Sequence, residues 1–161
     1  MKILITGGAG FIGSHLTKLL SIDNDVIIYD IKQPKQGNVD SIIGDVNNLE
    51  KNLESCTNID VVIHLAASVG VENTETDPIN TMNSNILGTK NILEFCKTNK
   101  VKKIILASSS EVYGEPIKIP IEESQTPIPI TTYGVSKLAG EEYVKSYAKM
   151  HGLRYSILRF F

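Results

Sequence analysis

A cluster of glycines at residues 6–14, TGGAGFIGS, constrains the fold more than any other feature of the chain. It follows a short apolar, β-branched run at residues 2–6 and precedes an amphipathic segment at residues 12–20. The loop therefore connects a predicted buried strand to a predicted helix. Its glycines fit the pattern GxGxxG from Gly8, or GxxGxxG from Gly7, which is typical of a site for the pyrophosphate of a dinucleotide.

Each glycine has a physical task in such a loop. A tight turn needs a residue without a Cβ atom, and a second glycine lets the backbone approach the pyrophosphate. Gly13 would let the helix pack closely on the sheet, and the N-terminus of that helix offers oriented N–H groups to the phosphates. The same glycines also suit a turn without a ligand, so the motif needs support from a second feature.

Asp30 is that second feature. It ends a second apolar run at residues 25–30 and lies ~20 residues after the glycines, where a carboxylate meets the hydroxyls of the adenosine ribose. A carboxylate at this place repels a 2′-phosphate, so NAD is favoured over NADP. Lys32 and Lys35 follow closely and would soften that preference, and the alternative role for Asp30 is that of a residue in the turn after the strand.

Short apolar runs alternate with longer amphipathic ones along the whole chain. This alternation predicts βαβ units, and the continuously apolar strands predict a parallel sheet covered on both faces. The expected fold class is therefore α/β, a Rossmann-like doubly wound parallel sheet that forms one domain over residues 1–161 and binds its ligand at the carboxyl ends of the strands. The predicted strands are residues 2–6, 25–30, 41–45, 61–66, 103–108 and 154–159, and the predicted helices are residues 12–20, 48–55, 78–99 and 132–151.

The composition excludes several classes of protein. Sixteen lysines and arginines against eighteen aspartates and glutamates give a net charge of −2, which leaves no electrostatic footprint for nucleic acid or anionic lipid. Two distant cysteines, Cys56 and Cys96, and three scattered histidines predict neither a disulfide nor a metal site. No apolar run approaches the ~20 residues of a membrane span, and the N-terminus lacks a signal-peptide pattern, so a cytoplasmic location is expected.

Two polar segments fall near the predicted ligand edge of the sheet. Residues 108–114, SSSEVYG, follow the fifth strand, and Tyr133 and Lys137 are four residues apart at the start of a helix, so both lie on one helix face. Tyrosine has a reference pKa of ~10, and a nearby ammonium together with a positive nicotinamide ring would lower it. A serine of the first segment could then hydrogen-bond the substrate oxygen that Tyr133 deprotonates. Without each other, the two segments are a capped loop and a solvated helix face.

Between these segments lies a proline-rich stretch, residues 114–131. It holds four of the six prolines of the chain. Proline removes a backbone donor and restricts the residue before it, so this stretch is predicted to be a loop. Loops of this length inside compact domains are usually functional or disordered.

Taken together, the segments resemble those of a known family. TGGAGFIGS at residues 6–14, GDV at 44–46, HLAA at 64–67, SSSEVYG at 108–114, YGVSK at 133–137 and LRFF at 158–161 resemble the extended short-chain dehydrogenases/reductases. Within these the likeness is to the NAD-dependent nucleotide-sugar epimerases and dehydratases, and it spans the whole chain. This set of motifs in this order is specific to the superfamily and much less specific to one substrate.

The resemblance implies a role for individual residues. In the family, the catalytic Ser or Thr lies five positions before the glycine of the Tyr-Gly pair, which is Ser109 here; Tyr133 is the acid/base and Lys137 its partner and a ribose ligand. The remaining cofactor residues that it implies are Gly7, Gly10, Phe11, Ile12 and Gly13 at the pyrophosphate, Asp30 at the ribose, Asp45 and Val46 at the adenine, Leu65, Ala66 and Ala67 beside the riboses, Ser84 or its neighbour Asn85 as a polar residue early in the helix that follows the fourth strand, and Phe161 at the nicotinamide.

The family mechanism implies that Tyr133 removes a proton from a sugar hydroxyl while hydride passes from the same carbon to NAD and later returns. The dehydratases carry an Asp-Glu pair where this chain has Ser110 and Glu111. The missing aspartate favours a UDP-sugar 4-epimerase. Glu111 also fits a UDP-glucuronate decarboxylase or another dehydratase, and it fits a solvated or helix-capping acid. An NAD-binding sensor or scaffold without catalysis is the alternative of another class.

Two further expectations come from the resemblance. The family continues beyond the sixth strand into a C-terminal substrate domain, so the chain is expected to be the N-terminal part of a longer enzyme that binds a nucleotide sugar. The family also implies a homodimer built from the helices at residues 78–99 and 132–151. The last strand, without a continuation, would leave an apolar edge exposed.

Overall fold

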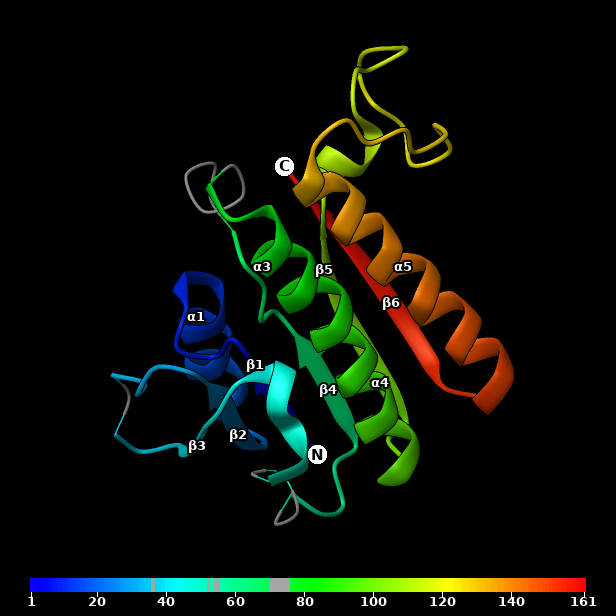
Figure 1. The fold of residues 1–161 in the computed structure, drawn as a ribbon. Helices are drawn as coiled ribbons and strands as arrows, with labels where there is room; N and C mark the ends of the chain where they lie inside the picture. Colours follow the sequence, from blue (N-terminus) through cyan, green and yellow to red (C-terminus); the bar gives the residue numbers. More distant parts are fainter. Residues whose placement is uncertain (36, 52, 54–55, 70–75) are drawn as a thin grey trace.

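The computed structural model describes residues 1–35, 37–51, 53, 56–69 and 76–161. These form a six-stranded sheet in the order β3-β2-β1-β4-β5-β6, and every neighbouring pair is parallel. This is the doubly wound sheet that the sequence predicts (Figure 1). Its strands are β1 (Lys2–Thr6), β2 (Asp25–Asp30), β3 (Asp40–Ile43), β4 (Val61–His64), β5 (Lys103–Ser109) and β6 (Arg154–Phe160), which differ from the predicted ranges by at most two residues at an end.

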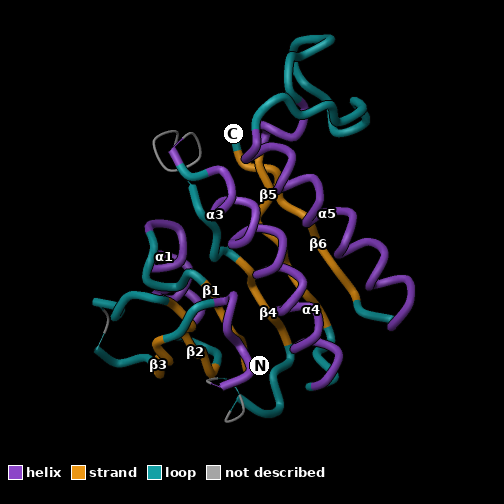
Figure 2. The backbone as a smooth tube through the Cα atoms, viewed as in Figure 1, coloured by secondary structure: helices purple, strands orange, loops and turns teal. Residues whose placement is uncertain are grey.

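The central strands are apolar on both sides because both faces of the sheet are covered. Leu4 and Ile5 are adjacent in β1 and are both fully buried, although neighbouring strand residues point to opposite faces. Leu4 belongs to the larger core cluster, together with residues of α4 (Gly88–Thr98) and α5 (Thr132–His151). Ile5 belongs to a smaller cluster against which α1 (Phe11–Leu20) packs. Figure 2 shows these layers, with strands in orange and helices in purple.

The helix predicted at residues 78–99 has three parts. They are α3 (Pro78–Met82), a π-helical turn η2 (Asn83–Leu87) and α4. Asp77 caps α3 by accepting the N–H of Asn80 at 3.0 Å. Periodicity at 3.6 residues predicts the helix but not the wider turn inside it, and π-turns occur often at functional sites.

The prediction of a helix at residues 48–55 is wrong. The structure has a short 3-10 segment, η1 (Val46–Lys51), which is broken by non-helical backbone angles at Asn48. Residues 52, 54 and 55 of the prediction lie outside the described part of the chain. A second 3-10 turn, η3 (Ser110–Tyr113), follows β5 directly.

The proline-rich residues 114–131 form a loop, as predicted, and this loop projects from the body of the molecule (Figures 1 and 2). Its two ends lie against each other at Gly114, where a Cβ atom would lie 2.0 Å from the carbonyl oxygen of Ile128. Gly114 also has a φ of +62°, which favours glycine. The loop returns the chain to Thr131, the N-cap of α5. It therefore joins the two polar segments that the sequence singles out.

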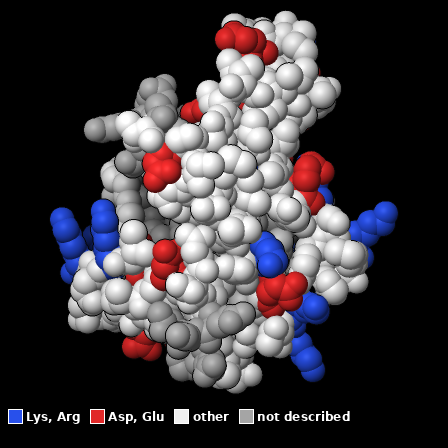
Figure 3. Space-filling model, viewed as in Figure 1, with Lys and Arg blue, Asp and Glu red and all other residues white. Residues whose placement is uncertain are grey.

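The surface carries charges of both signs. On the face shown in Figure 3, lysines, arginines, aspartates and glutamates are interspersed, and neutral residues cover most of the surface. Within the described ranges, no helix combines the length and apolar character of a membrane span, and no group of three or more potential metal ligands comes together. On the edge strand β6, Leu158 and Phe160 are 44% and 39% exposed.

A buried histidine connects the centre of the sheet to α4. His64, the last residue of β4, lies 2.7 Å from the hydroxyl of Thr6 through Nδ1 and 3.2 Å from the hydroxyl of Thr89 through Nε2. Burial, followed by the charge of Lys137, lowers the pKa of His64 to about 3. The imidazole is therefore neutral in the folded protein at neutral pH.

This histidine should make stability depend on pH. Because the folded pKa lies below the unfolded value of about 6.5, the unfolded chain takes up the proton first, and stability is complete above about pH 6.5 and falls toward pH 3. Between about pH 7 and pH 5 the loss is about 2 kcal/mol. Denaturant unfolding at both pH values should show this loss in the wild type and in His15→Gln, an exposed control, but not in His64→Gln. Equal pH dependence in all three would contradict the assignment.

Candidate functional site

The glycine loop lies at the carboxyl end of β1. The strand order reverses between β1 and its neighbour β4, because β2 and β3 follow β1 on one side and β5 and β6 follow β4 on the other. Gly7 has a φ of +72°, and a Cβ atom there would lie 2.7 Å from the backbone nitrogen of Ala66. A Cβ atom on Gly13 would lie 2.2 Å from the carbonyl oxygen of Gly7. Both positions exclude any side chain, because the obstructing atoms are backbone. The loop is thus held against α1 on one side and against the chain after β4 on the other.

The helix that follows this loop has no side-chain cap. α1 begins at Phe11, and its N-cap is Gly10, which has no side chain to bond the N–H groups of the first turn. Phe11 and Ile12 are exposed. The first N–H groups of a helix have no partner within it and attract anions. The loop has no room for side chains at Gly7 and Gly13, and the N-terminus of α1 follows it directly. Both features fit the diphosphate of a dinucleotide.

Asp30 reaches the same loop from the end of β2. One carboxylate oxygen accepts the N–H of Ala9 at 2.9 Å, and the other accepts the N–H of Lys32 at 2.9 Å. The bond to Lys32 belongs to the turn after the strand, which is the alternative role that the sequence analysis gave Asp30. The bond to Ala9 holds the glycine loop. Each carboxylate oxygen has a further lone pair, so Asp30 retains the capacity to accept ribose hydroxyls.

Asp45 and Val46 differ in their surroundings. The carbonyl oxygen of Asp45 accepts the hydroxyl of Tyr29 at 2.9 Å, and its carboxylate accepts the N–H of Asn47 at 2.9 Å. Val46 is buried in the larger core cluster, where its side chain blocks a Cβ atom on Gly88 at 2.7 Å. The structure therefore places the side chain of Val46 in the core.

Leu65, Ala66 and Ala67 are half-buried and lie beside the glycine loop. The N–H of Leu65 bonds the carbonyl of Thr6 at 3.0 Å, and the N–H of Ala66 bonds the Thr6 hydroxyl at 3.3 Å. The structure therefore brings this segment next to Gly7, as a wall for a ligand requires. Phe161 follows β6 and is 85% exposed, at the end marked C beside the start of α5 in Figure 1.

The two candidates in η2 have different surroundings. Ser84 is half-buried, 3.5 Å from the side-chain nitrogen of Asn47. Asn85 is buried, and its side chain makes three bonds: it accepts the N–H of Ser68 at 2.8 Å, and it donates to the carbonyl of Ser68 at 3.2 Å and to the hydroxyl of Ser136 at 2.9 Å. The hydroxyl of Ser136 in turn donates to the carbonyl of Tyr133 at 2.7 Å. Asn85 therefore ties the chain after β4 to the first turn of α5.

Ser109, Tyr133 and Lys137 come together at this edge. Ser109 ends β5, and its side chain lies close enough to Tyr133 to act on the pKa of that phenol. Lys137 lies one turn further along α5, with its ammonium 5.6 Å from the centre of the Tyr133 ring, and it donates to the carbonyl of Ala107 at 3.0 Å. Residues from a strand end and from a helix start, separated by the long loop, thus form one cluster.

The electrostatics of this cluster refine the sequence prediction. Burial and then the charge of Glu111 raise the pKa of Tyr133, and the hydrogen bond from Ser109 acts in the opposite sense. Burial lowers the pKa of Lys137 to about 8. The sequence analysis named two groups that would lower the pKa of Tyr133, a nearby ammonium and a cationic nicotinamide ring. In the structure the Lys137 ammonium alone does not bring this pKa below its usual value. The other, a cationic ring, belongs to the ligand.

The sequence analysis assigned no definite role to three residues at the site. Glu111, left open between catalysis and capping, accepts the hydroxyl of Thr131 at 2.7 Å, and the same hydroxyl accepts the N–H of Gly134 at 2.9 Å. Asn85 was named only as an alternative to Ser84, and the sequence analysis did not predict its bond to Ser136. Glu141 was not singled out at all, although it continues the four-residue spacing of Tyr133 and Lys137.

Comparisons with known proteins show the family of the chain. The model of the family described as "NAD dependent epimerase/dehydratase family" matches residues 3–161. A UDP-glucose 4-epimerase of Halalkalibacterium halodurans is 38% identical over 100% of this chain and 50% of its own length.

Two solved structures have the same fold. A UDP-glucose 4-epimerase from Brucella ovis in complex with NAD has a TM-score of 0.90 and 36% identity over 99% of this chain and 51% of its own. A UDP-glucuronic acid 4-epimerase from Bacillus cereus in complex with UDP-glucuronic acid and NAD has a TM-score of 0.89 and 36% identity over 100% of this chain and 56% of its own. The chain thus spans about half the length of these proteins.

Proposed function

The chain belongs to the NAD dependent epimerase/dehydratase family, and from this membership we propose that it is the cofactor-binding half of an NAD-dependent nucleotide-sugar 4-epimerase. The observation that carries the proposal is the position of the buried Lys137 ammonium, 5.6 Å from the centre of the Tyr133 ring and bound to the carbonyl of Ala107, two residues before Ser109. A protein that only binds NAD would use Lys137 as a ribose ligand but would have no need of the full set of three side chains. A UDP-sugar is the favoured substrate, because the relatives of similar sequence and structure are named for UDP-sugars.

The glycine loop and its neighbours would hold NAD. Gly7, Gly10 and Gly13 with the start of α1 fit the pyrophosphate, and Asp30 retains acceptors for the adenosine ribose. Leu65 to Ala67 form the adjoining wall. When bound, NAD supplies the acceptor and donor of hydride.

The residues of the cluster divide the proton chemistry. Tyr133 takes the proton of the C4 hydroxyl as the base, and Ser109 donates a hydrogen bond to the same oxygen. Lys137 is held by the carbonyl of Ala107, and its charge stabilises the tyrosinate against the burial that raises the pKa of Tyr133. The proton returns from Tyr133 to the sugar oxygen after the ring of the sugar has presented its other face.

Glu111 supports an epimerase over a dehydratase. Its carboxylate is bound to Thr131, the N-cap of the helix that carries Tyr133. A glutamate committed to this bond orders the start of α5. It is then less available as a base that removes a proton from the sugar in an elimination.

The test is an assay of the full-length protein that contains this chain. The purified protein with NAD is incubated separately with UDP-glucose and UDP-glucuronate, and the products are identified by NMR. Formation of the C4 epimer is the expected result. Loss of CO₂ from UDP-glucuronate would establish the decarboxylase, formation of a 4-keto-6-deoxy sugar would establish the dehydratase, and NAD binding without turnover would favour the sensor.

Asp30 should set the choice of cofactor. Replacing Asp30 with alanine removes the carboxylate that repels a 2′-phosphate, and it leaves Lys32 nearby, so the preference for NAD over NADP should fall by about tenfold or more. Equilibrium binding of both nucleotides measures the ratio. Asp40→Ala, an exposed aspartate at the start of β3, is the control. An unchanged ratio in Asp30→Ala would contradict the role.

A homodimer is part of the proposal. The exposed apolar side chains of α3, η2 and α5 support it: Ile79, Met82, Leu87, Val135 and Tyr143. α3 and η2 both lie against α5, so these side chains belong to neighbouring helices. Sedimentation of the full-length protein should give the mass of two chains, and a change of Met82 and Leu87 to glutamate should give that of one.

A further inference from the structure

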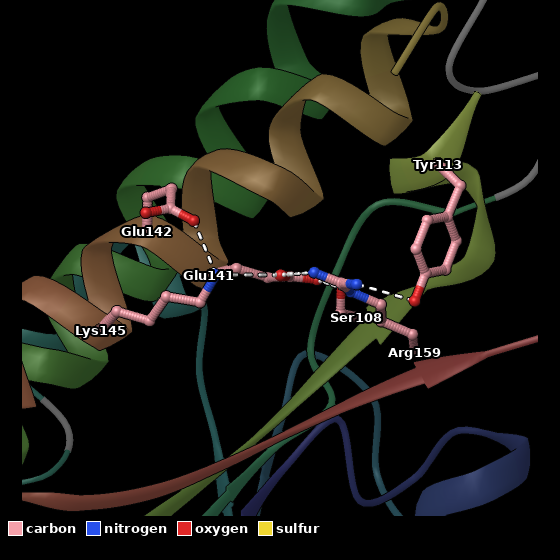
Figure 4. Close-up of polar contacts among 6 residues, drawn as sticks. All are labelled: Ser108, Tyr113, Glu141, Glu142, Lys145 and Arg159. Carbon is pink, nitrogen blue, oxygen red and sulfur yellow. Dashed lines mark hydrogen bonds and ion pairs between the residues drawn. The ribbon is translucent and has the colours of Figure 1, made fainter. Parts of the chain in front are cut away.

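A buried ionic network lies behind the candidate active site (Figure 4). Glu141, on α5, is fully buried. Its carboxylate accepts the hydroxyl of Ser108 at 2.6 Å, and it accepts Nε and Nη2 of Arg159 at 2.8 and 2.7 Å. Arg159 in turn donates through Nη1 to the hydroxyl of Tyr113 at 2.8 Å, and its guanidinium lies 4.7 Å from the centre of the Tyr113 ring.

The charges in this network compensate each other. Burial alone would raise the pKa of the Glu141 carboxyl, but the hydrogen bonds from Arg159 and Ser108 hold it below its usual range. The two-pronged contact with Arg159 fixes direction as well as distance, because the guanidinium is planar. The next residue, Glu142, is exposed and pairs with Lys145 at 2.7 Å. Lys145 also lies 3.6 Å from Glu141, so the two glutamates share this ammonium, but of the two Glu141 is the one that contacts Ser108 and Arg159 in Figure 4.

Two residues of the network, Ser108 and Tyr113, lie on either side of Ser109 along the chain. Ser108 precedes it, and Tyr113 ends the 3-10 turn that Ser109 caps. Both flanking side chains are buried and are tied to Glu141, directly or through Arg159.

The same network also acts on the helix that carries the proton-transfer residues. Tyr133, Lys137 and Glu141 follow one another at four-residue intervals and therefore lie along one face of α5. Lys137 and Glu141 bond the Ala107 carbonyl and the Ser108 hydroxyl of β5, and Tyr133 lies near the side chain of the next residue, Ser109. The position of α5 along and around its axis is thus determined at three successive turns.

We infer that Glu141 and Arg159 are positioning residues for the reaction: their ion pair holds α5 against the ends of β5 and β6 and so sets the spacing between Ser109 and the Tyr133–Lys137 pair. This inference rests on the proposed function. The competing explanation is a structural brace whose loss lowers stability and leaves the active-site spacing unchanged.

The experiment compares Glu141→Gln with Glu142→Gln in the full-length, NAD-loaded protein, at a temperature where thermal melts show both to be folded. Gln keeps the shape of Glu141 and removes its charge. Glu141→Gln should lower kcat by about tenfold or more, because small displacements of reacting groups are costly, with KM for the UDP-sugar within about threefold. Glu142→Gln should stay within about twofold of the wild type.

A second readout follows Tyr133 directly. Its titration is obtained from tyrosinate absorbance, as the difference between each protein and the same protein carrying Tyr133→Phe. Ser109, Glu111 and Lys137 act on Tyr133, so a displaced α5 should shift its pKa by about half a unit or more. The shift is expected in Glu141→Gln and absent in Glu142→Gln.

The outcomes separate the two explanations. A Glu141→Gln protein with a lower melting temperature, an unchanged kcat and an unchanged Tyr133 titration would overturn the inference. If that variant does not fold, Ser108→Ala removes one bond of the network, and a kcat equal to that of the wild type would overturn it instead. If the wild type turns over no UDP-sugar, the proposed function fails, and the titration of Tyr133 still decides the positioning role.

Discussion

Replacing Tyr133 with phenylalanine should lower kcat of the full-length protein by about 10²–10⁴-fold, the range that a general acid/base contributes. The change removes only the hydroxyl, whose pKa Ser109 influences. The ring that lies near the Lys137 ammonium remains. NAD should still bind, because the glycine loop and Asp30 are untouched. Steady-state kinetics and equilibrium binding of NAD measure the two effects separately.

Tyr155→Phe is the matched control, because Tyr155 lies on β6 and is 45% exposed. It should retain wild-type kcat. If Tyr133→Phe also retains full turnover, Tyr133 is not the base, and the proposed division of roles is wrong. If Tyr133→Phe loses NAD as well, the loss of turnover reports a damaged site and not missing proton transfer.

Replacing Gly13 with alanine should abolish NAD binding and weaken the fold. The new Cβ atom would lie 2.2 Å from the carbonyl oxygen of Gly7 and 2.6 Å from Cα of Gly8. Both are backbone atoms, so α1 must move away from the loop that it supports. Overpacking of this kind costs about 1–3 kcal/mol. The affinity for NAD should fall by about a hundredfold or more, because the helix N-terminus and the loop no longer meet.

Gly37→Ala provides the comparison, since a Cβ atom at Gly37 meets nothing within 4 Å. It should match the wild type in both thermal melting and NAD titration. Wild-type affinity for NAD in Gly13→Ala would show that the close approach of α1 to the loop is not needed for binding.

Most of the fold could be predicted because its signals are local. An apolar, β-branched run such as residues 2–6 reports a buried strand, and the alternation of such runs with amphipathic segments reports a parallel sheet. The failures also have local causes. The kink at Asn48 and the π-turn at Asn83–Leu87 change the hydrogen-bond pattern of a helix, and neither is visible in a pattern that averages over several turns.

By itself, the sequence indicated the candidates for chemistry: the glycine loop, Asp30 and the Tyr133–Lys137 pair through their spacing in short segments, and Ser109 through the family resemblance. The tertiary structure alone decided how these residues act on each other. Glu141 meets Ser108 across 33 positions and Arg159 across 18, and the pKa of Tyr133 rises because of burial and the charge of Glu111. Such contacts depend on strand order and on the rotation of α5, and electrostatic effects depend on what surrounds a group in space. Periodicity along the chain contains neither quantity.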